Sequence, residues 1–181
     1  IVSPEITHKT EVGGVMLDVP AGELGEAYER LIARVQANAP NATIEGVLIS
    51  PMLKGGVEMI LGVQDDAVFG PVVMLGLGGI FVEVLRDVTF RIAPFGIEEA
   101  HRMIGELRGV AMLQGARGQM PCDLDALALA LSRLSLFAAA QRGHFTSIDI
   151  NPLLVRPKGE GAVALDALIL TPQAAGGQHA A

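Results

Sequence analysis

The sequence predicts an α+β protein with largely antiparallel sheets and packed helices, and three observations support this fold class. Short apolar runs bounded by Gly and Pro dominate the first half of the chain. Two longer runs with helical spacing follow between Glu98 and Gln141, and an alternating hairpin comes last. Because strands and helices occur in blocks, antiparallel pairing is favoured over a parallel sheet with alternating helices.

The first fifty residues are expected to hold one helix between two strands. Val15–Val19 and Thr43–Ile49 are apolar runs that end at Pro20 and at Ser50–Pro51, which is typical of strands. Between them an amphipathic helix is predicted over Glu23–Asn38, because its apolar residues follow helical spacing: Leu24, Ala27, Leu31, Ile32 and Val35.

The middle of the chain predicts further strands and then helices. The expected strands are Gly56–Val63, Val72–Leu75, Phe81–Leu85 and Val88–Ile92, with Gln64–Asp66 as a turn. The expected helices are Glu98–Leu107, Val110–Gln114 and a longer one that Asp123 caps and that runs to about Gln141.

The hairpin near the C-terminus brings polar side chains together. In Ser147–Val155, polar and apolar residues alternate, which indicates a half-buried strand, and Ala162–Leu170 is the expected returning strand. A turn centred on Lys158–Gly159 would set Asn151 opposite Asp166, with Asp149 nearby. Such an oxygen-rich corner suits Mg²⁺. Taken alone, however, an Asp-x-Asn pattern more often marks a solvated strand face.

Composition limits the classes of function. Half of the residues are hydrophobic, 18% are charged, the mean hydropathy is +0.44 and the net charge is −7. No clustered basic stripe is present, so nucleic-acid binding is disfavoured. The charge-free stretch 67–82 is broken by glycines and is shorter than the roughly 20 residues of a membrane span, so no membrane partner is expected. The high apolar content indicates a surface that another domain or chain covers.

The number of cysteines and the first residue bear on the cellular location and on the length of the parent polypeptide. The single cysteine, Cys122, excludes an internal disulfide and favours a cytoplasmic location. The chain starts at Ile1 without an initiator methionine or targeting peptide, so we expect a piece of a longer polypeptide.

Five sequence blocks occur together in a characteristic order. They are Ser3–Val15 (SPEITHKTEVGGV), Gly55–Gly62 (GGVEMILG), Val68–Val73 (VFGPVV), Gly76–Val84 (GLGGIFVEV) and Asp149–Leu153 (DINPL). In this order the blocks resemble the ATP-grasp domain of NDP-forming acyl-CoA synthetases, a group that includes ADP-forming acetyl-CoA synthetase and, more distantly, the β-subunit of succinyl-CoA synthetase. The resemblance covers residues 1–170.

The resemblance implies an ATP-grasp fold that is truncated at its N-terminus, because the family has a phosphate-binding lysine strand before the first block. Residues 1–50 would be the remainder of the first subdomain, residues 51–170 the second, and residues 171–181 a flexible tail. The implied reaction is acyl-CoA + ADP + Pi = acid + CoA + ATP, through an acyl phosphate and a phosphohistidine. CoA-binding and CoA-ligase domains would lie on the same chain or on a partner subunit, and the enzyme would be an oligomer.

The same resemblance assigns site residues. Asp149, Asn151 and Asp166 would hold the Mg²⁺ that bridges the phosphates of ATP or ADP. Glu58 would accept hydrogen bonds from the ribose hydroxyls, although an exposed strand carboxylate explains it equally well. His8 would carry the phosphoryl group, and its alternative role is to order its own loop.

Apolar and glycine residues complete the implied site. Ile49 and Met52 would sandwich the adenine ring, and both also fit an ordinary core. Gly13, Gly14, Gly78 and Gly79 would let backbone approach the phosphates. An alternative for the whole chain is a catalytically silent, regulatory synthetase-like domain of a protein-lysine acetyltransferase.

Overall fold

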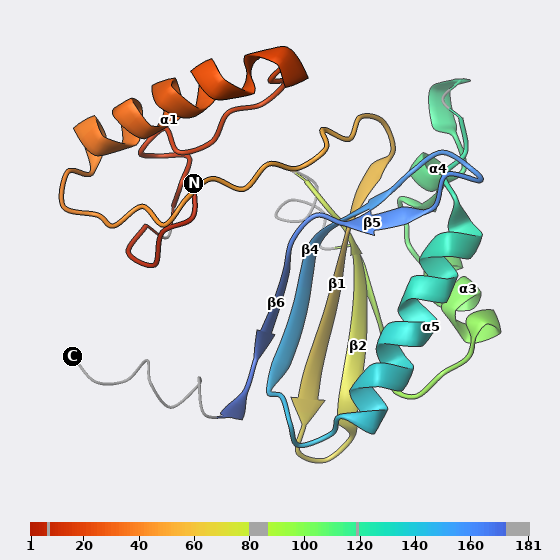
Figure 1. Ribbon diagram of the computed structural model, residues 1–181. Helices are drawn as coiled ribbons and strands as arrows, with labels where there is room; N and C mark the ends of the chain where they lie inside the picture. The colour runs from red at the N-terminus through yellow and green to blue at the C-terminus, as the bar shows by residue number, and fades with distance from the viewer. Residues whose placement is uncertain (7, 80–86, 119, 173–181) are drawn as a thin grey trace. The chain divides into compact units, whose positions relative to one another are not determined.

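The computed structural model describes residues 1–6, 8–79, 87–118 and 120–172, and the chain forms two compact units (Figure 1). The N-terminal unit is Ile1–Lys54 and the C-terminal unit is Gly55–Ala181. The expected strand Phe81–Leu85 and most of the expected tail lie outside the described residues.

The N-terminal unit contains one long helix, α1 (Leu24–Asn38), which follows a 3₁₀ turn at Ala21–Glu23. Its buried side chains Leu31 and Val35 pack with Ile1 and Ile6 in a small core. The helix prediction is therefore confirmed, because the apolar stripe of α1 is the part that this core buries.

Both strands predicted in the N-terminal unit are wrong. Val15–Val19 and Thr43–Ile49 have irregular backbone, and within the described part of this unit the only β contact is the isolated bridge between Val2 and Gly46. A strand persists when a neighbour accepts its backbone hydrogen bonds. An apolar run without such a neighbour does not form a strand.

The C-terminal unit is built on an antiparallel sheet. Its strand order is β3-β2-β1-β4-β5. β6 follows β5 in the chain and pairs with a different part of the same strand, β4. The strands are β1 (Val57–Asp66), β2 (Gly70–Leu77), β3 (Val88–Ile92), β4 (Ser147–Val155), β5 (Ala162–Ala164) and β6 (Ala167–Leu170). The antiparallel α+β prediction is confirmed.

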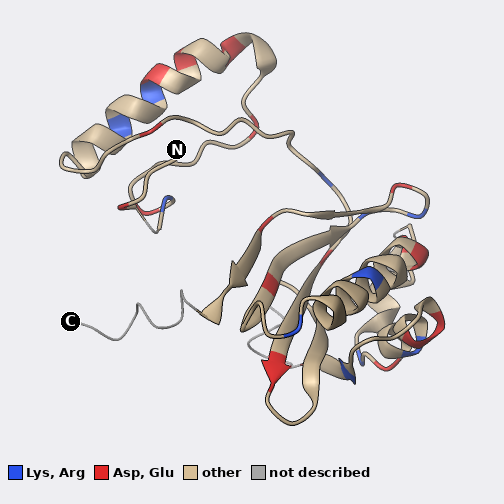
Figure 2. Cartoon of the chain, turned by 60° about the horizontal axis from the view of Figure 1, so that its bottom comes forward, with Lys and Arg blue, Asp and Glu red and all other residues tan. Residues whose placement is uncertain are grey.

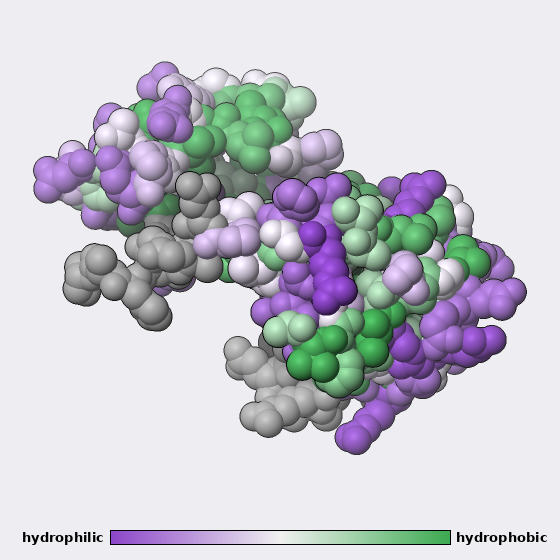
Figure 3. All heavy atoms as spheres, turned by 90° about the horizontal axis from the view of Figure 1, so that it is seen from below, coloured by the Kyte–Doolittle hydropathy of each residue, from purple (hydrophilic) through white to green (hydrophobic). Residues whose placement is uncertain are grey.

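The turn between β1 and β2 differs from the expectation. Gln64–Asp66 was predicted as a turn, but these residues extend β1, and Asp65 and Asp66 pair with Pro71 and Gly70. The carboxylate of Asp66 accepts hydrogen bonds from the amides of Val68 and Phe69, both at 2.8 Å. The side chain of Asp66 therefore stabilises a turn that follows the three polar residues and is not formed by them. Figure 3 views the molecule from below and shows hydrophobic and hydrophilic residues side by side on the surface that faces the viewer.

Three helices cover one face of the sheet: α3 (Ile97–Gly105), α4 (Val110–Leu113) and α5 (Leu124–Ala140). All three confirm the predicted helical runs. The main core lies between α3, α5 and the inward side chains of β1, β2 and β4. Among the described helices, none has the length and apolar character needed to cross a bilayer.

The other face of the sheet is more open, and we call it the open face. The register sets five residues in one row across it, one from each of β3, β2, β1, β4 and β6: Phe90, Met74, Gly62, Asp149 and Leu168. Phe90 and Leu168 are more than half exposed. Sequence alternation puts Glu58 of β1 on the same face.

Candidate functional site

The hairpin register places two of the three predicted metal ligands, Asn151 and Asp166, opposite each other. Leu153 pairs with Ala164 and Ile150 with Ala167, so Asn151 lies opposite Asp166 in the break between β5 and β6. The amide of Asn151 also donates to the carbonyl of Asp166 at 3.2 Å. The pairing predicted from the turn position is therefore confirmed.

The donor set fits a hard cation. Asp149, Asn151 and Asp166 are exposed and supply two carboxylates and one amide oxygen, the ligand types that Mg²⁺ prefers. One carboxylate oxygen of Asp166 accepts the amide of Ala167 at 2.9 Å, which fixes the side chain near the strand break. Within the described ranges no three side chains of the His, Cys, Asp and Glu types form a metal cluster, so a site here needs the amide of Asn151.

Asp149 has a glycine as one of its two cross-strand neighbours on the open face. Its partner on β1 is Gly62, which pairs in turn with Met74 of β2. A Cβ atom at Gly62 would come no closer than 3.4 Å to Met74, so packing does not demand glycine here. The glycine instead leaves space beside the carboxylate of Asp149.

Glu58 lies against the Gly78–Gly79 turn. The amide of Gly78 donates to the carbonyl of Glu58 at 2.7 Å, and a Cβ atom on Gly78 would lie only 2.7 Å from that same oxygen. Gly79 has φ +67°, and a Cβ there would lie 3.8 Å from a carboxylate oxygen of Glu58. The structure thus brings together three predicted site residues where β1 begins and β2 ends, and Gly78 has to be glycine.

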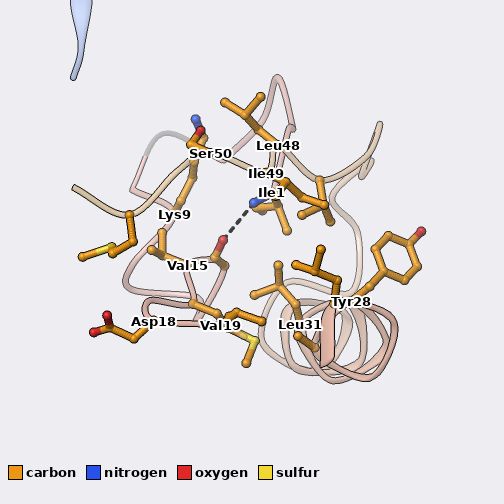
Figure 4. A pocket seen from close by; sticks show the side chains of 16 residues that line it. Ile1, Lys9, Val15, Asp18, Val19, Tyr28, Leu31, Leu48, Ile49 and Ser50 are labelled. Atoms are coloured by element: carbon orange, nitrogen blue, oxygen red, sulfur yellow. Dashed lines mark hydrogen bonds between the residues drawn. The ribbon is translucent and has the colours of Figure 1, made fainter. Parts of the chain in front are cut away.

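The N-terminal unit has an apolar pocket of about 320 Å³, drawn in Figure 4. Ile49 and Met52 line it and are 65% and 50% exposed, so neither is an ordinary core residue. Lys9, Tyr28 and Ser50 add polar groups to the lining. In the described structure no backbone hydrogen bond joins residues 47–53 to another segment, which leaves their amides and carbonyls available to a ligand.

The glycine pair Gly13–Gly14 closes the loop beside this pocket. Gly13 has φ +70°, and Gly14 donates its amide to the carbonyl of Lys9 at 2.7 Å. The nitrogen of Ile1 donates to the carbonyl of Gly14 at 2.9 Å, the dashed line of Figure 4. A Cβ on Gly14 would lie 2.7 Å from the side chain of Ile1. The glycines therefore allow a close approach within the unit.

His8 does not join the apolar pocket. It is exposed and lines a separate, open cavity of about 490 Å³ together with Glu5, Glu11 and Pro40. The carbonyl of His8 accepts the amide of Glu11 at 3.1 Å, which holds the residue in a tight turn. The neighbouring residue Lys9 lines the apolar pocket instead.

Sequence reasoning missed the role of two residues in this region, Lys9 and Glu5. The carboxylate of Glu5 accepts the amide of Thr43 at 2.8 Å and its hydroxyl at 3.1 Å. The backbone hydrogen bond from Thr43 is the main cause that lowers the pKa of Glu5. Thr43 is distant in sequence and belongs to no motif, so nothing in the sequence indicates this pairing.

Comparisons with known proteins agree with the fold. A model of the "ATP-grasp domain" family matches residues 1–170. The β-subunit of the ADP-forming acetate–CoA ligase II of Pyrococcus furiosus is 43% identical over 171 residues, which are 94% of this chain and 72% of that protein. The ADP-forming acetate–CoA ligase I of Archaeoglobus fulgidus is 42% identical over 163 residues, 90% of this chain but 24% of that protein.

A solved structure also matches most of this chain. It is the dinucleotide-forming acetyl-coenzyme A synthetase 1 of Ca. Korarchaeum cryptofilum in complex with coenzyme A and Mg-AMPPCP, with its phosphohistidine segment pointing towards the nucleotide-binding site. The match has a TM-score of 0.80 at 37% identity and covers 94% of this chain and 74% of the other. The chain spans about a quarter of the longer relatives and about three quarters of the subunit-sized ones. With its residues 1–170, this chain belongs to the ATP-grasp domain family.

Proposed function

We propose that this chain is the nucleotide- and Mg²⁺-binding part of an ADP-forming acyl-CoA synthetase. The observation that carries the proposal is the hairpin register, which sets Asn151 opposite Asp166 beside Asp149. Relatives named as ADP-forming acetate–CoA ligases, at 42% and 43% identity, support the choice of reaction. They favour an active ligase over a silent regulatory domain.

Asp149, Asn151 and Asp166 are the proposed magnesium ligands. When bound, the metal ion would neutralise charge on the phosphates of ATP or ADP. The two carboxylates supply the negative charge for the cation, and the amide of Asn151 supplies a neutral oxygen between them. The opposed register of Asn151 and Asp166, with Asp149 two residues before Asn151 on β4, supports this assignment.

The remaining predicted residues receive separate roles. The apolar pocket with Ile49 and Met52 would accept a purine ring. The backbone of residues 47–53, which makes no backbone hydrogen bond to another described segment, would bind the edge of that ring. Glu58 would accept two hydrogen bonds from ribose hydroxyls, with Gly78 and Gly79 keeping its surroundings open. Gly13 and Gly14 would allow phosphates close to the backbone.

His8 is the proposed phosphoryl carrier. Its imidazole is exposed in a short turn, so it is accessible to a phosphoryl donor. Attack of a ring nitrogen on the terminal phosphorus of ATP would form a P–N bond and break the bond to ADP. The CoA-binding and CoA-ligase domains that complete the reaction would lie elsewhere on the same chain or on a partner subunit.

The test is a melting experiment on this chain with Mg²⁺ and ADP. A ligand at about 100 times its dissociation constant stabilises a protein by about 2.7 kcal/mol, so we expect a rise in Tm of several degrees. The rise should require Mg²⁺ and should vanish in Asp149→Ala. Glu98→Ala, an exposed carboxylate on α3, is the matched control and should keep the rise. A rise that survives in Asp149→Ala would refute the assigned magnesium site. No rise in this chain, and none in the longer protein that carries the expected lysine strand, would refute nucleotide binding.

The same samples also separate the role of His8 from nucleotide binding. His8→Ala should keep the Tm rise with Mg-ADP but should lose an acid-labile label transferred from γ-labelled ATP. The control His144→Ala should keep both. A label that survives in His8→Ala would exclude the carrier role.

A further inference from the structure

Helix α5 is apolar on both of its sides. Its inner side packs in the core through Leu127, Leu131 and Ala138. Its outer side also carries large apolar residues, with Leu129, Leu136 and Phe137 exposed by 40%, 54% and 47%. Figure 2 shows α5 as a largely uncharged helix. A helix that is hydrophobic all round is normally covered on both sides.

The outer side of α5 has a self-complementary charge pattern. Asp125, Leu129 and Arg133 are spaced four residues apart and are all exposed, so they form one line along the helix. Asp125 and Arg133 lie at equal distances on either side of Leu129, about 6 Å along the axis at 1.5 Å per residue. The carboxylate of Asp125 is positioned by His101, whose Nε2 lies 3.2 Å from it.

We propose that the outer side of α5 pairs with the same helix of a second copy of this chain. The two helices would run antiparallel around a two-fold axis at Leu129, as an isologous contact requires. Each Asp125 would then face Arg133 of the second copy, and the two Leu129 side chains would meet at the axis. The pattern fits a second copy because one register satisfies both charges at once.

The same arrangement brings a further exposed apolar residue to the contact. Phe137, one turn beyond Arg133, would lie toward the segment that precedes α5 in the second copy. Met120 is 69% exposed and Pro121 is exposed as well, so this segment offers an apolar surface for the contact. Exposed apolar groups of α5 and of the segment before it would thus both lie at the contact.

The contact is small for a protein–protein interface. A single helix pair falls at the low end of specific interfaces, below about 1,200 Å² in total. A dimer with a dissociation constant on the order of micromolar is therefore expected. Charge pairs contribute to the contact, so added salt should weaken it.

Sedimentation of this chain and three charge variants tests the pairing. The wild type should dimerise at tens of micromolar. Asp125→Arg and Arg133→Asp should each raise the dissociation constant about tenfold or more, because like charges then face each other. The double variant Asp125→Arg/Arg133→Asp should restore dimerisation. A wild-type chain that stays monomeric, or a double variant no better than the single ones, would overturn the proposal.

A crosslink tests the position of the axis. In a Cys122→Ser background, Leu129→Cys should form an intermolecular disulfide under mild oxidation, because residues at a two-fold axis meet their own copies. Gln36→Cys on the exposed side of α1 is the control and should not. Equal crosslinking at both positions would mean random collision and would refute the register. None of these outcomes depends on nucleotide binding.

Discussion

At the scale of single residues, Gly78 shows how backbone contact constrains the site. Its amide bonds to the carbonyl of Glu58, and any side chain would press on the same oxygen. We expect Gly78→Ala to destabilise the C-terminal unit by about 1–3 kcal/mol, the usual cost of overpacking. It should also displace Glu58. Urea denaturation followed by circular dichroism measures the first effect.

A second glycine provides the matched control for this prediction. Gly105 ends α3, and a Cβ atom there would meet no neighbouring atom within 4 Å. Gly105→Ala should therefore be neutral or slightly stabilising, because alanine favours the helix. If both variants lose the same stability, the close approach at Gly78 is not the cause.

At the scale of elements, Asp123 joins a helix to a turn. Its carboxylate accepts the amide of Ala126 in the first turn of α5, and those of Gly159 and Gly161 in the turn after β4, each at 3.0 Å. These bonds, with that from Ala126 first, lower the pKa of Asp123. Asp123→Asn should reduce the Tm at pH 7 by a few degrees, because an amide accepts fewer bonds and carries no charge.

The pH dependence of this effect has a definite sign. A carboxyl group whose pKa is lower in the folded state stabilises fully above its unfolded pKa of about 3.9 and loses that stabilisation as the pH falls through the folded value. The difference between wild type and Asp123→Asn should therefore shrink below about pH 4. Melting curves from pH 7 to pH 2.5 check this, with Glu98→Gln as the control. A constant difference would argue against the ionised cap.

The hairpin of β4 shows what sequence can establish about this protein. Alternation and a glycine turn are local signals, and together they gave the correct register between Asn151 and Asp166. The strands expected at Val15–Val19 and Thr43–Ile49 failed because strand formation depends on a partner that local pattern does not reveal. The Glu5–Thr43 contact could not be predicted from the sequence either, since it joins residues that are distant in the chain and belong to no shared motif.

At the scale of the whole molecule, the two units differ in how much core they possess. Among its described residues, the N-terminal unit has a core cluster of four buried residues around α1, whereas the core of the C-terminal unit spans the sheet and three helices. Small cores stabilise weakly. We expect amides of α1 to exchange with deuterium well before those of β1 and β4, as mass spectrometry of exchanged peptides would show. Simultaneous exchange in both units would indicate one cooperative structure.

The place of β1 between β2 and β4 has a consequence for biosynthesis. β2 follows β1 at once, but the β4 residues that pair with β1 come roughly 80 to 100 positions later. On a translating ribosome, the nascent chain therefore carries a long, apolar, half-paired strand until the second half has been made. Its open edge can pair with other chains during that interval, which makes chaperone cover most valuable before β4 emerges.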